Sequence, residues 1–89
     1  MQLRFYRDPE TGRPHVENHG VSTDEVRETL TRPVEDRPGS SGSRVAIGQT
    51  EAGRFLRIIY KREGSSLFII TAYDLPSRQL KALRRRRKR

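Results

Sequence analysis

Residues 44–73 read RVAIGQTEAGRFLRIIYKREGSSLFIITAY, and this stretch decides the fold. Apolar residues recur with a period of two on either side of two turn segments, Thr50–Gly53 and Arg62–Ser66, and this period is typical of β-strands. The stretch therefore predicts a three-stranded meander, with strands at residues 44–48, 55–61 and 67–73. The last two strands are apolar on both sides, which predicts that both faces of the sheet are at least partly covered.

The segment before the meander predicts one strand, a short helix and a loop. Leu3–Tyr6 is typical of a short opening strand. A short helix is expected between Pro14 and Gly20, because proline suits a first helical turn and glycine suits a C-terminal stop. Residues 35–43 are polar and have no periodicity, so we expect a loop there.

The clearest local signal is a capping box at the start of a second helix. Ser22 is expected as the N-cap, and Glu25 lies three positions later, where its side chain can accept from the backbone of Ser22. Val21 and Val26 are placed to form a hydrophobic staple across this end. The helix is expected to end at about Thr31, because a proline follows two residues later.

A third helix is expected at the C-terminus. It begins at Pro76-Ser77 and carries Leu80 and Leu83 on one face. The predicted order is therefore one strand, two helices, the meander and a helix. This order indicates a single α+β domain over residues 1–83, with helices packed on an antiparallel sheet.

The charge of the chain is unevenly distributed. The 89 residues include 19 Lys+Arg and 11 Asp+Glu, for a net charge of +8, but residues 1–83 hold 13 basic and 11 acidic groups. The other six cations form the tail RRRRKR, which would attract any polyanion with a steep salt dependence. We therefore predict RNA-binding residues at Arg84, Arg85, Arg86, Arg87, Lys88 and Arg89.

Several classes are excluded by composition. The chain has no cysteine, which rules out disulfide scaffolds, thiolate metal sites and a cysteine nucleophile. Its longest apolar run is four residues, Leu67–Ile70, whereas a membrane span needs about 20. The N-terminal sequence MQLRFYRDPE has no apolar core of a signal peptide.

Four segments together resemble the BrnT family. Asn18–Ser22 is similar to its KHGVS-type segment, and Ile47–Leu56 followed by Ile59-Tyr60 is similar to its IG-x-T-x-x-GR-x-L…VY hairpin. Phe68–Ala72 resembles its R-I-I-S-A strand, and Asp8-Pro9 its N-terminal DP. The resemblance covers about residues 5–75.

This resemblance implies a compact RelE-like fold and a bacterial cytoplasmic endoribonuclease, the toxin of a type II toxin–antitoxin pair. It implies that no metal or other cofactor is used, and that RNA or the ribosome and a cognate antitoxin are the partners. Asn18 stands where the family has lysine, and Tyr73 stands where it has arginine. The same Thr-Ala-Tyr segment also resembles a neighbouring RelE-like group of small bacterial proteins of unassigned function.

Four residues are the catalytic candidates. Cleavage of RNA by its own 2′-OH needs a base, an acid and cations around the phosphorus, and histidine is the usual acid or base, which makes His19 a candidate. Arg54 and Arg57 carry the planar donor fork that suits phosphate, and Tyr73 has a hydroxyl that can donate a proton or a ring that can stack on a base. The simpler interpretations are a histidine that caps its own helix, arginines in ion pairs, and a core tyrosine.

Other functions remain open at this point. A non-catalytic RNA-binding or protein-binding module on the same fold, and a homodimer, fit the same residues. His15 and His19 are four apart and share a helix face, but a zinc site would lack a third ligand and the acidic residue of H-E-x-x-H.

Overall fold

The computed structural model describes residues 1–87, so the predicted RNA-binding residues Lys88 and Arg89 lie outside the described residues. Five strands form one sheet in the order β1-β5-β4-β3-β2. In chain order the elements are β1 (Gln2–Phe5), the 3₁₀ helix η1 (His15–His19), α1 (Thr23–Thr31), β2 (Glu35–Pro38), β3 (Arg44–Gln49), β4 (Phe55–Glu63), β5 (Ser66–Asp74) and α2 (Ser77–Arg87).

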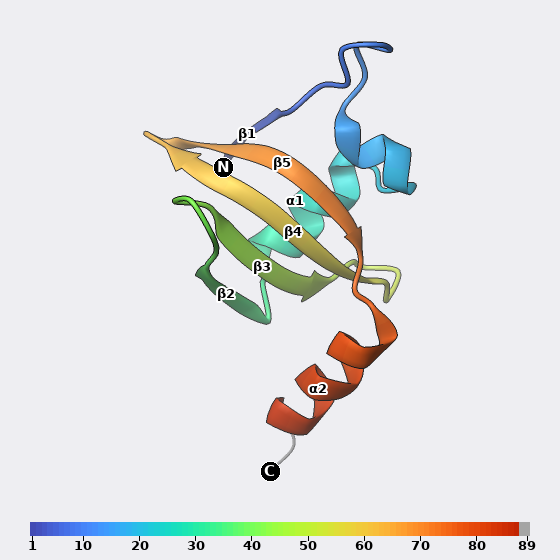
Figure 1. Ribbon diagram of the computed structural model, residues 1–89. Helices are drawn as coiled ribbons and strands as arrows, with labels where there is room; N and C mark the ends of the chain where they lie inside the picture. Colours follow the sequence, from blue (N-terminus) through green and yellow to red (C-terminus); the bar gives the residue numbers. More distant parts are fainter. Residues whose placement is uncertain (88–89) are drawn as a thin grey trace.

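The sheet is mixed, and the prediction of an antiparallel sheet is wrong. The meander β3-β4-β5 is antiparallel as expected, but β1 pairs with β5 in parallel, with Leu3 opposite Leu67. A parallel pair needs a long crossover connection. Here the chain between β1 and β5 contains all three remaining strands of the sheet, β2, β3 and β4 (Figure 1). Nothing local in Leu3–Tyr6 specifies which strand it pairs with, so its direction could not be predicted.

A fifth strand lies in the segment predicted to be a loop. Glu35–Pro38 pairs antiparallel with β3 and forms one edge of the sheet. The strand is short and charged and ends in proline, which are features of edge strands. The strand contains no apolar side chains that alternate. Instead, its Asp36 is hydrogen-bonded to Arg44 of β3 and Tyr60 of β4.

The prediction of three helices is also wrong. Residues 1–87 form two α-helices, α1 and α2, and the segment between Pro14 and Gly20 forms the five-residue 3₁₀ helix η1. Gly20 ends it in the left-handed conformation, at φ 71°, as its sequence position predicted. The segment is too short for an α-helix and is fixed by Val16, which is buried in the core.

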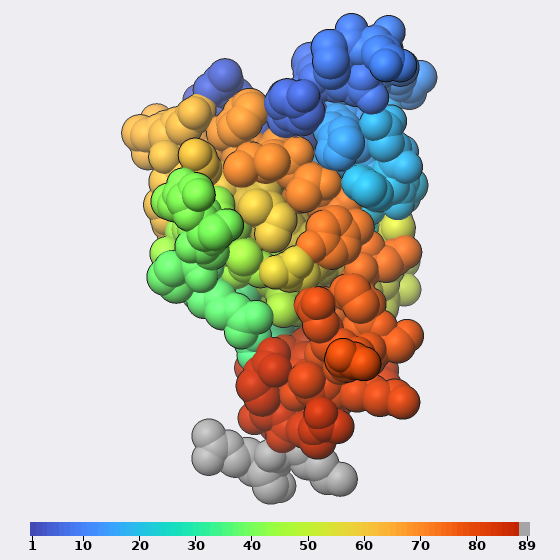
Figure 2. All heavy atoms as spheres, in the orientation of Figure 1, coloured from blue at the N-terminus to red at the C-terminus, as the bar shows by residue number. Residues whose placement is uncertain are grey.

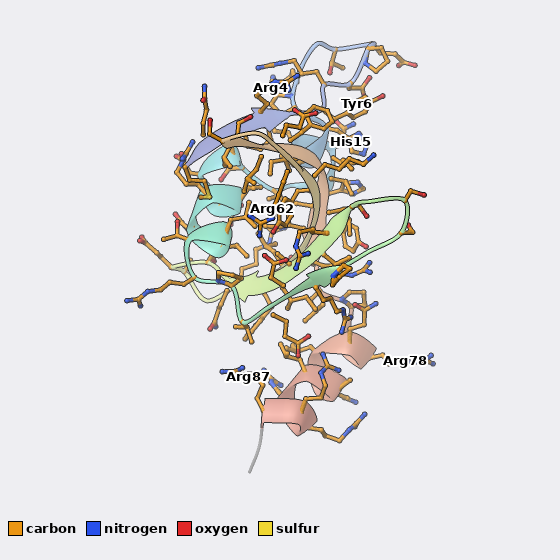
Figure 3. The ribbon with its side chains drawn as sticks, turned by 90° about the vertical axis from the view of Figure 1, so that its left-hand side faces the viewer. Arg4, Tyr6, His15, Arg62, Arg78 and Arg87 are labelled. Carbon is orange, nitrogen blue, oxygen red and sulfur yellow. The ribbon has the colours of Figure 1, made fainter. Side chains whose placement is uncertain are left out.

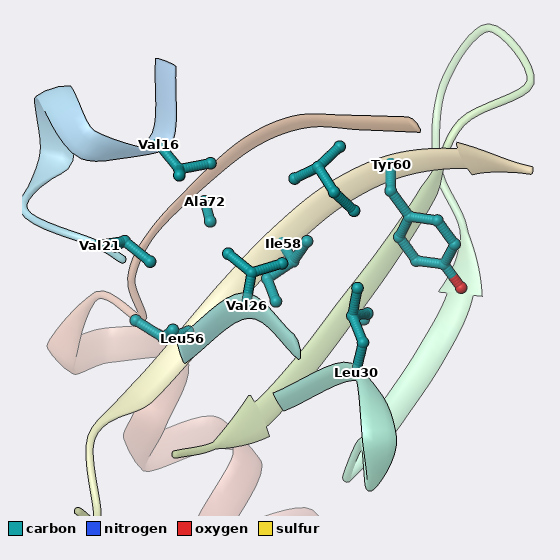
Figure 4. Packing of buried hydrophobic residues seen from close by; sticks show 10 residues of the cluster. Val16, Val21, Val26, Leu30, Leu56, Ile58, Tyr60 and Ala72 are labelled. Carbon is teal, nitrogen blue, oxygen red and sulfur yellow. The ribbon is translucent and has the colours of Figure 1, made fainter. Parts of the chain in front are cut away.

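The predicted capping box of α1 is confirmed. The Ser22 hydroxyl accepts from the Glu25 backbone, and the Glu25 carboxylate accepts from the Ser22 backbone. This start aims Val26 and Leu30 at the sheet, where they pack over Ile58 (Figure 4). The buried cluster consists of Val16, Val21, Val26, Leu30, Ala46, Leu56, Ile58, Tyr60, Ile69 and Ala72.

Close packing of α1 on β3 depends on Gly48. A Cβ at this position would lie 2.8 Å from the Thr29 methyl group and 3.2 Å from the Thr29 carbonyl oxygen. Thr29 is fully buried, and its hydroxyl donates to the Glu25 carbonyl one turn earlier. The helix therefore approaches the strand so closely that only glycine fits.

The other face of the sheet is only partly covered. α1 lies behind the sheet in the view of Figure 1, whereas α2 lies at one end of it. There Leu80 and Leu83 pack against a second cluster that includes Ile47 and Leu75. The rest of this face, called here the open face, is hollowed between the N-terminal segment, the β2–β3 loop and α2 (Figure 2). None of the helices in residues 1–87 has the length and apolar character that a membrane span requires.

Candidate functional site

Four aromatic side chains form a row beside the second half of β5, beyond the residues that pair with β1. The ring centroids are 5.8 Å apart between Tyr6 and His15, 5.2 Å between His15 and His19, and 6.0 Å between His19 and Tyr73. Tyr6 is 44 % exposed and lies next to His15 at one corner of the molecule (Figure 3). The structure thus brings the predicted residues His19 and Tyr73 together from η1 and β5.

Arg57 completes this group from β4. It lies directly opposite Tyr73 in the β4–β5 register, and its Nη1 donates to the Tyr73 hydroxyl. The guanidinium carbon lies 5.8 Å from the Tyr73 ring centroid, a cation–π arrangement. Among the described residues, the Arg57 Nε is the buried side-chain nitrogen without a hydrogen-bond partner. The name catalytic group is used below, as a label only, for three of the catalytic candidates predicted from the sequence: His19, Tyr73 and Arg57.

A buried donor without a partner is costly, and the fold bears this cost at the Arg57 Nε. His19 is exposed and Tyr73 and Arg57 are half-buried, so a ligand can reach all three from the open face. The arrangement supplies one imidazole, one phenol and one guanidinium at the same place.

Arg54, the remaining catalytic candidate, is engaged elsewhere. Its Nε donates to the Asp74 carboxylate at 2.6 Å, and its Nη1 donates to the Gly20 carbonyl at 2.8 Å and to Glu25 at 3.1 Å. The Arg54 guanidinium lowers the pKa of the Asp74 carboxyl, chiefly through this hydrogen bond. Arg54 therefore joins the segments that carry His19 and Tyr73, and it is not free to bind phosphate.

A second network ties the β2 edge to the sheet. The Tyr60 hydroxyl donates to Asp36 at 2.5 Å, and Arg44 donates to the same carboxylate at 2.9 Å. Burial raises the pKa of Tyr60, and its bond to Asp36 adds to this. Tyr60 and Arg44 are thus structural here, and the sequence offered no signal for their partner because Asp36 lay in the predicted loop.

The basic run is helical where it is described. Arg84, Arg85, Arg86 and Arg87 form the last turn of α2, where cations interact favourably with the helix dipole. Arg86 donates to both carboxylate oxygens of Glu35, at 2.9 and 3.0 Å. This bond lowers the pKa of Glu35 and fixes the C-terminal half of α2 against β2.

The remaining points concern metal ligands and a surface hollow. Within residues 1–87, no three His, Cys, Asp or Glu side chains gather as metal ligands would. A shallow hollow of 630 Å³ lies between α1 and the β3–β4 turn, lined by Asp24, Arg27, Glu28, Thr31, Arg32, Gln49, Thr50 and Glu51. Its charges are mixed, and it contains none of the predicted site residues.

Comparison with known proteins gives one match. The profile of a family described as "Domain of unknown function (DUF4258)" matches residues 13–74. No curated protein and no solved structure matches the chain. The matched residues include the catalytic group and Arg54, and they exclude β1 and α2. Because the match covers more than half of the 89 residues, the chain belongs to the DUF4258 family.

Proposed function

We propose that the protein is an endoribonuclease that works without a metal, with the catalytic group acting on RNA bound at the open face. The observation that carries this proposal is the convergence of His19, Tyr73 and Arg57, from η1, β5 and β4, at one exposed place. These three side chains have the chemistry that transesterification of RNA requires.

Each residue has one role in the proposed step. His19 takes the proton of the 2′-OH, whose oxygen forms a bond to the adjacent phosphorus. Arg57 stabilises the charge that develops on the phosphoryl oxygens through its guanidinium. Tyr73 gives its hydroxyl proton to the 5′-oxygen as the P–O5′ bond breaks. The products are a 2′,3′-cyclic phosphate and a 5′-hydroxyl.

The biological role rests on the resemblance of residues 5–75 to the BrnT family. In this proposal the protein is the toxin of a bacterial pair, acts in the cytoplasm and is neutralised by a cognate antitoxin. Expression of the chain alone in a bacterium should then stop growth, and the His19→Ala variant should not. Arrest by both proteins would contradict a toxin that works through this site.

The test of catalysis uses purified protein, a defined single-stranded RNA and EDTA. Replacing a general base typically costs 10²–10⁴-fold, so His19→Ala should lower the cleavage rate by at least about 10²-fold. Tyr73→Phe and Arg57→Gln should also lower it. His15→Asn is the matched control, since it removes an imidazole one ring further along the row and should cost far less.

The products report the mechanism, and variants purified in the same way exclude a contaminating nuclease. Fragments should carry 2′,3′-cyclic phosphate ends, and thermal unfolding should show that each variant is folded. Cleavage that His19→Ala leaves undiminished, or a wild-type protein that cuts no RNA, would overturn the proposed site.

A second candidate function is RNA binding without cleavage. It is favoured by the bonds of Arg54 to Asp74, Glu25 and Gly20, which occupy this arginine. Among the described residues, the arginine beside His19 and Tyr73 is then Arg57. Salt-dependent binding of RNA by a wild-type protein that forms no cyclic phosphate would support this function over the first.

A further inference from the structure

The exposed side of α2 carries four cations in one stripe. At about 100° per residue, Arg78, Lys81, Arg84 and Arg85 fall within one third of the helix circumference, on the side turned away from the buried Leu83. Arg84 forms the edge of this third that is nearest to Leu80. All four side chains are exposed. They are called here the basic stripe, and it begins six residues before the arginine run.

Two arginines of the same helix face the other way. Arg86 is bonded to both oxygens of Glu35, and Arg87 is close enough to lower the pKa of Glu35 by its charge. Figure 3 shows Arg78 and Arg87 on opposite sides of α2. The run is therefore not a set of equivalent cations, because the docking of α2 separates those that hold the helix from those that face solvent.

We propose that the basic stripe is a binding surface for the phosphate backbone of single-stranded RNA, and that Arg86 holds α2 in place without contacting RNA. The identity of the polyanion as RNA rests on the proposed function. None of the salt bridges among residues 1–87 involves a stripe residue, so its cations are available to a ligand. Salt bridges do engage other arginines, among them Arg44, Arg54 and Arg86.

The composition and spacing of the stripe favour RNA over an acidic protein. A protein interface has a core of apolar and aromatic side chains, and none of the four stripe residues is apolar. Arg78, Lys81 and Arg85 follow one another along the axis by about 4.5 and about 6 Å, at a rise of 1.5 Å per residue. The long side chains are thus spread along the helix axis, where a phosphate backbone can run, and the guanidinium fork suits phosphate oxygens.

The stripe also lies outside the part of the chain that matches the DUF4258 profile. The catalytic group lies inside it. The backbone-binding surface therefore lies beyond the matched residues, and it should raise affinity for any RNA sequence equally.

The test measures binding of a fluorescent oligouridylate over a range of salt concentrations, in the His19→Ala background so that the probe stays intact. Each phosphate contact on a single strand contributes about 0.7 to the slope of log K against log salt. Arg78→Gln, Lys81→Gln, Arg84→Gln and Arg85→Gln should each reduce the slope by about this amount. Arg86→Gln removes the same charge, yet it should leave the slope unchanged and lower the melting temperature.

The matched pair Arg85→Gln and Arg86→Gln decides between the two descriptions of α2. Equal loss of slope from both would overturn the proposal, because it would mean that the arginines act as interchangeable cations. No loss from any stripe variant would overturn it as well. A polyglutamate peptide that binds as tightly as the oligouridylate would show that the surface fits an acidic protein instead.

Binding and cleavage are read separately, so the two proposals fail separately. A wild-type protein that leaves RNA intact, while the stripe variants lose slope as described, overturns the ribonuclease alone. Cleavage that depends on His19, with equal slopes in all α2 variants, overturns the stripe alone.

Discussion

The two faces of the sheet are built from the same strands and differ in what covers them. On the face toward α1, Leu56, Ile58 and Ile69 are fully buried. On the open face, Arg57, Ile59 and Tyr73 alternate with them along β4 and β5 and are half-buried. Because successive side chains of a strand point to opposite faces, one pair of strands provides both the core and the proposed site.

If the proposed function is correct, this difference separates stability from activity. The covered face gains stability from apolar area that water cannot reach. The open face keeps a guanidinium, a phenol and the edge imidazole accessible, and its one covered end is closed by α2. Substitutions on the first face should therefore change folding, whereas polar substitutions on the second should change chemistry or binding.

The largest expected effect on stability comes from shortening one side chain on each face. Ile58→Ala opens a cavity under α1 and should lower the free energy of unfolding by about 2–5 kcal/mol. Ile59→Ala, one residue later on the open face, should cost clearly less, because its side chain is already partly in water. Urea unfolding with unchanged m-values measures both, and equal losses would mean that the two faces are equally covered.

A smaller effect is expected from adding a methyl group to the covered face. Gly48→Ala places a Cβ against Thr29 and should cost about 1–3 kcal/mol, as overpacking does. Thr29→Ser removes the nearest methyl group and keeps the hydroxyl that bonds to Glu25. The double variant should regain part of the loss in thermal unfolding. Simple additivity of the two losses would contradict a direct clash.

The smallest effect concerns the link between the faces, Arg54. Arg54→Gln breaks its bonds to Asp74 and Glu25 and should cost about 1 kcal/mol, since these pairs are partly exposed. It should also weaken the nuclear Overhauser contact between the His19 and Tyr73 rings, because Gly20 and Asp74 adjoin them. An unchanged contact in a folded variant would mean that Arg54 does not position these rings.

The same link predicts a pH dependence with a definite sign. Arg54 lowers the pKa of Asp74 in the folded state, so the carboxylate stabilises the fold above its ordinary pKa, near 3.8. This contribution is lost as the pH falls below about 3.8 and through the lowered folded-state pKa. The melting temperature of Asp74→Asn should therefore fall less steeply in this acidic range than that of the wild type. Parallel curves would remove Asp74 as the titrating group.

Local sequence predicted several elements correctly. The strands of the meander, the capping box at Ser22 and the stop at Gly20 lie where the residues indicated, within a few positions at each end. Each of these depends on residues close together in the chain: side-chain alternation, a hydroxyl three residues from its donor, or a glycine that tolerates positive φ. Such interactions depend only on short segments of sequence.

Tertiary structure decided the rest. The parallel partner of β1 is the last strand, and Asp36 of β2 bonds to Tyr60, 24 residues away. Arg54 bonds to Gly20 across 34 residues. Two predicted site residues, His19 and Tyr73, are neighbours only because η1 packs beside β5. The sequence named these side chains by their chemistry, but their partners depend on which distant segments the core brings together, and no local pattern encodes that choice.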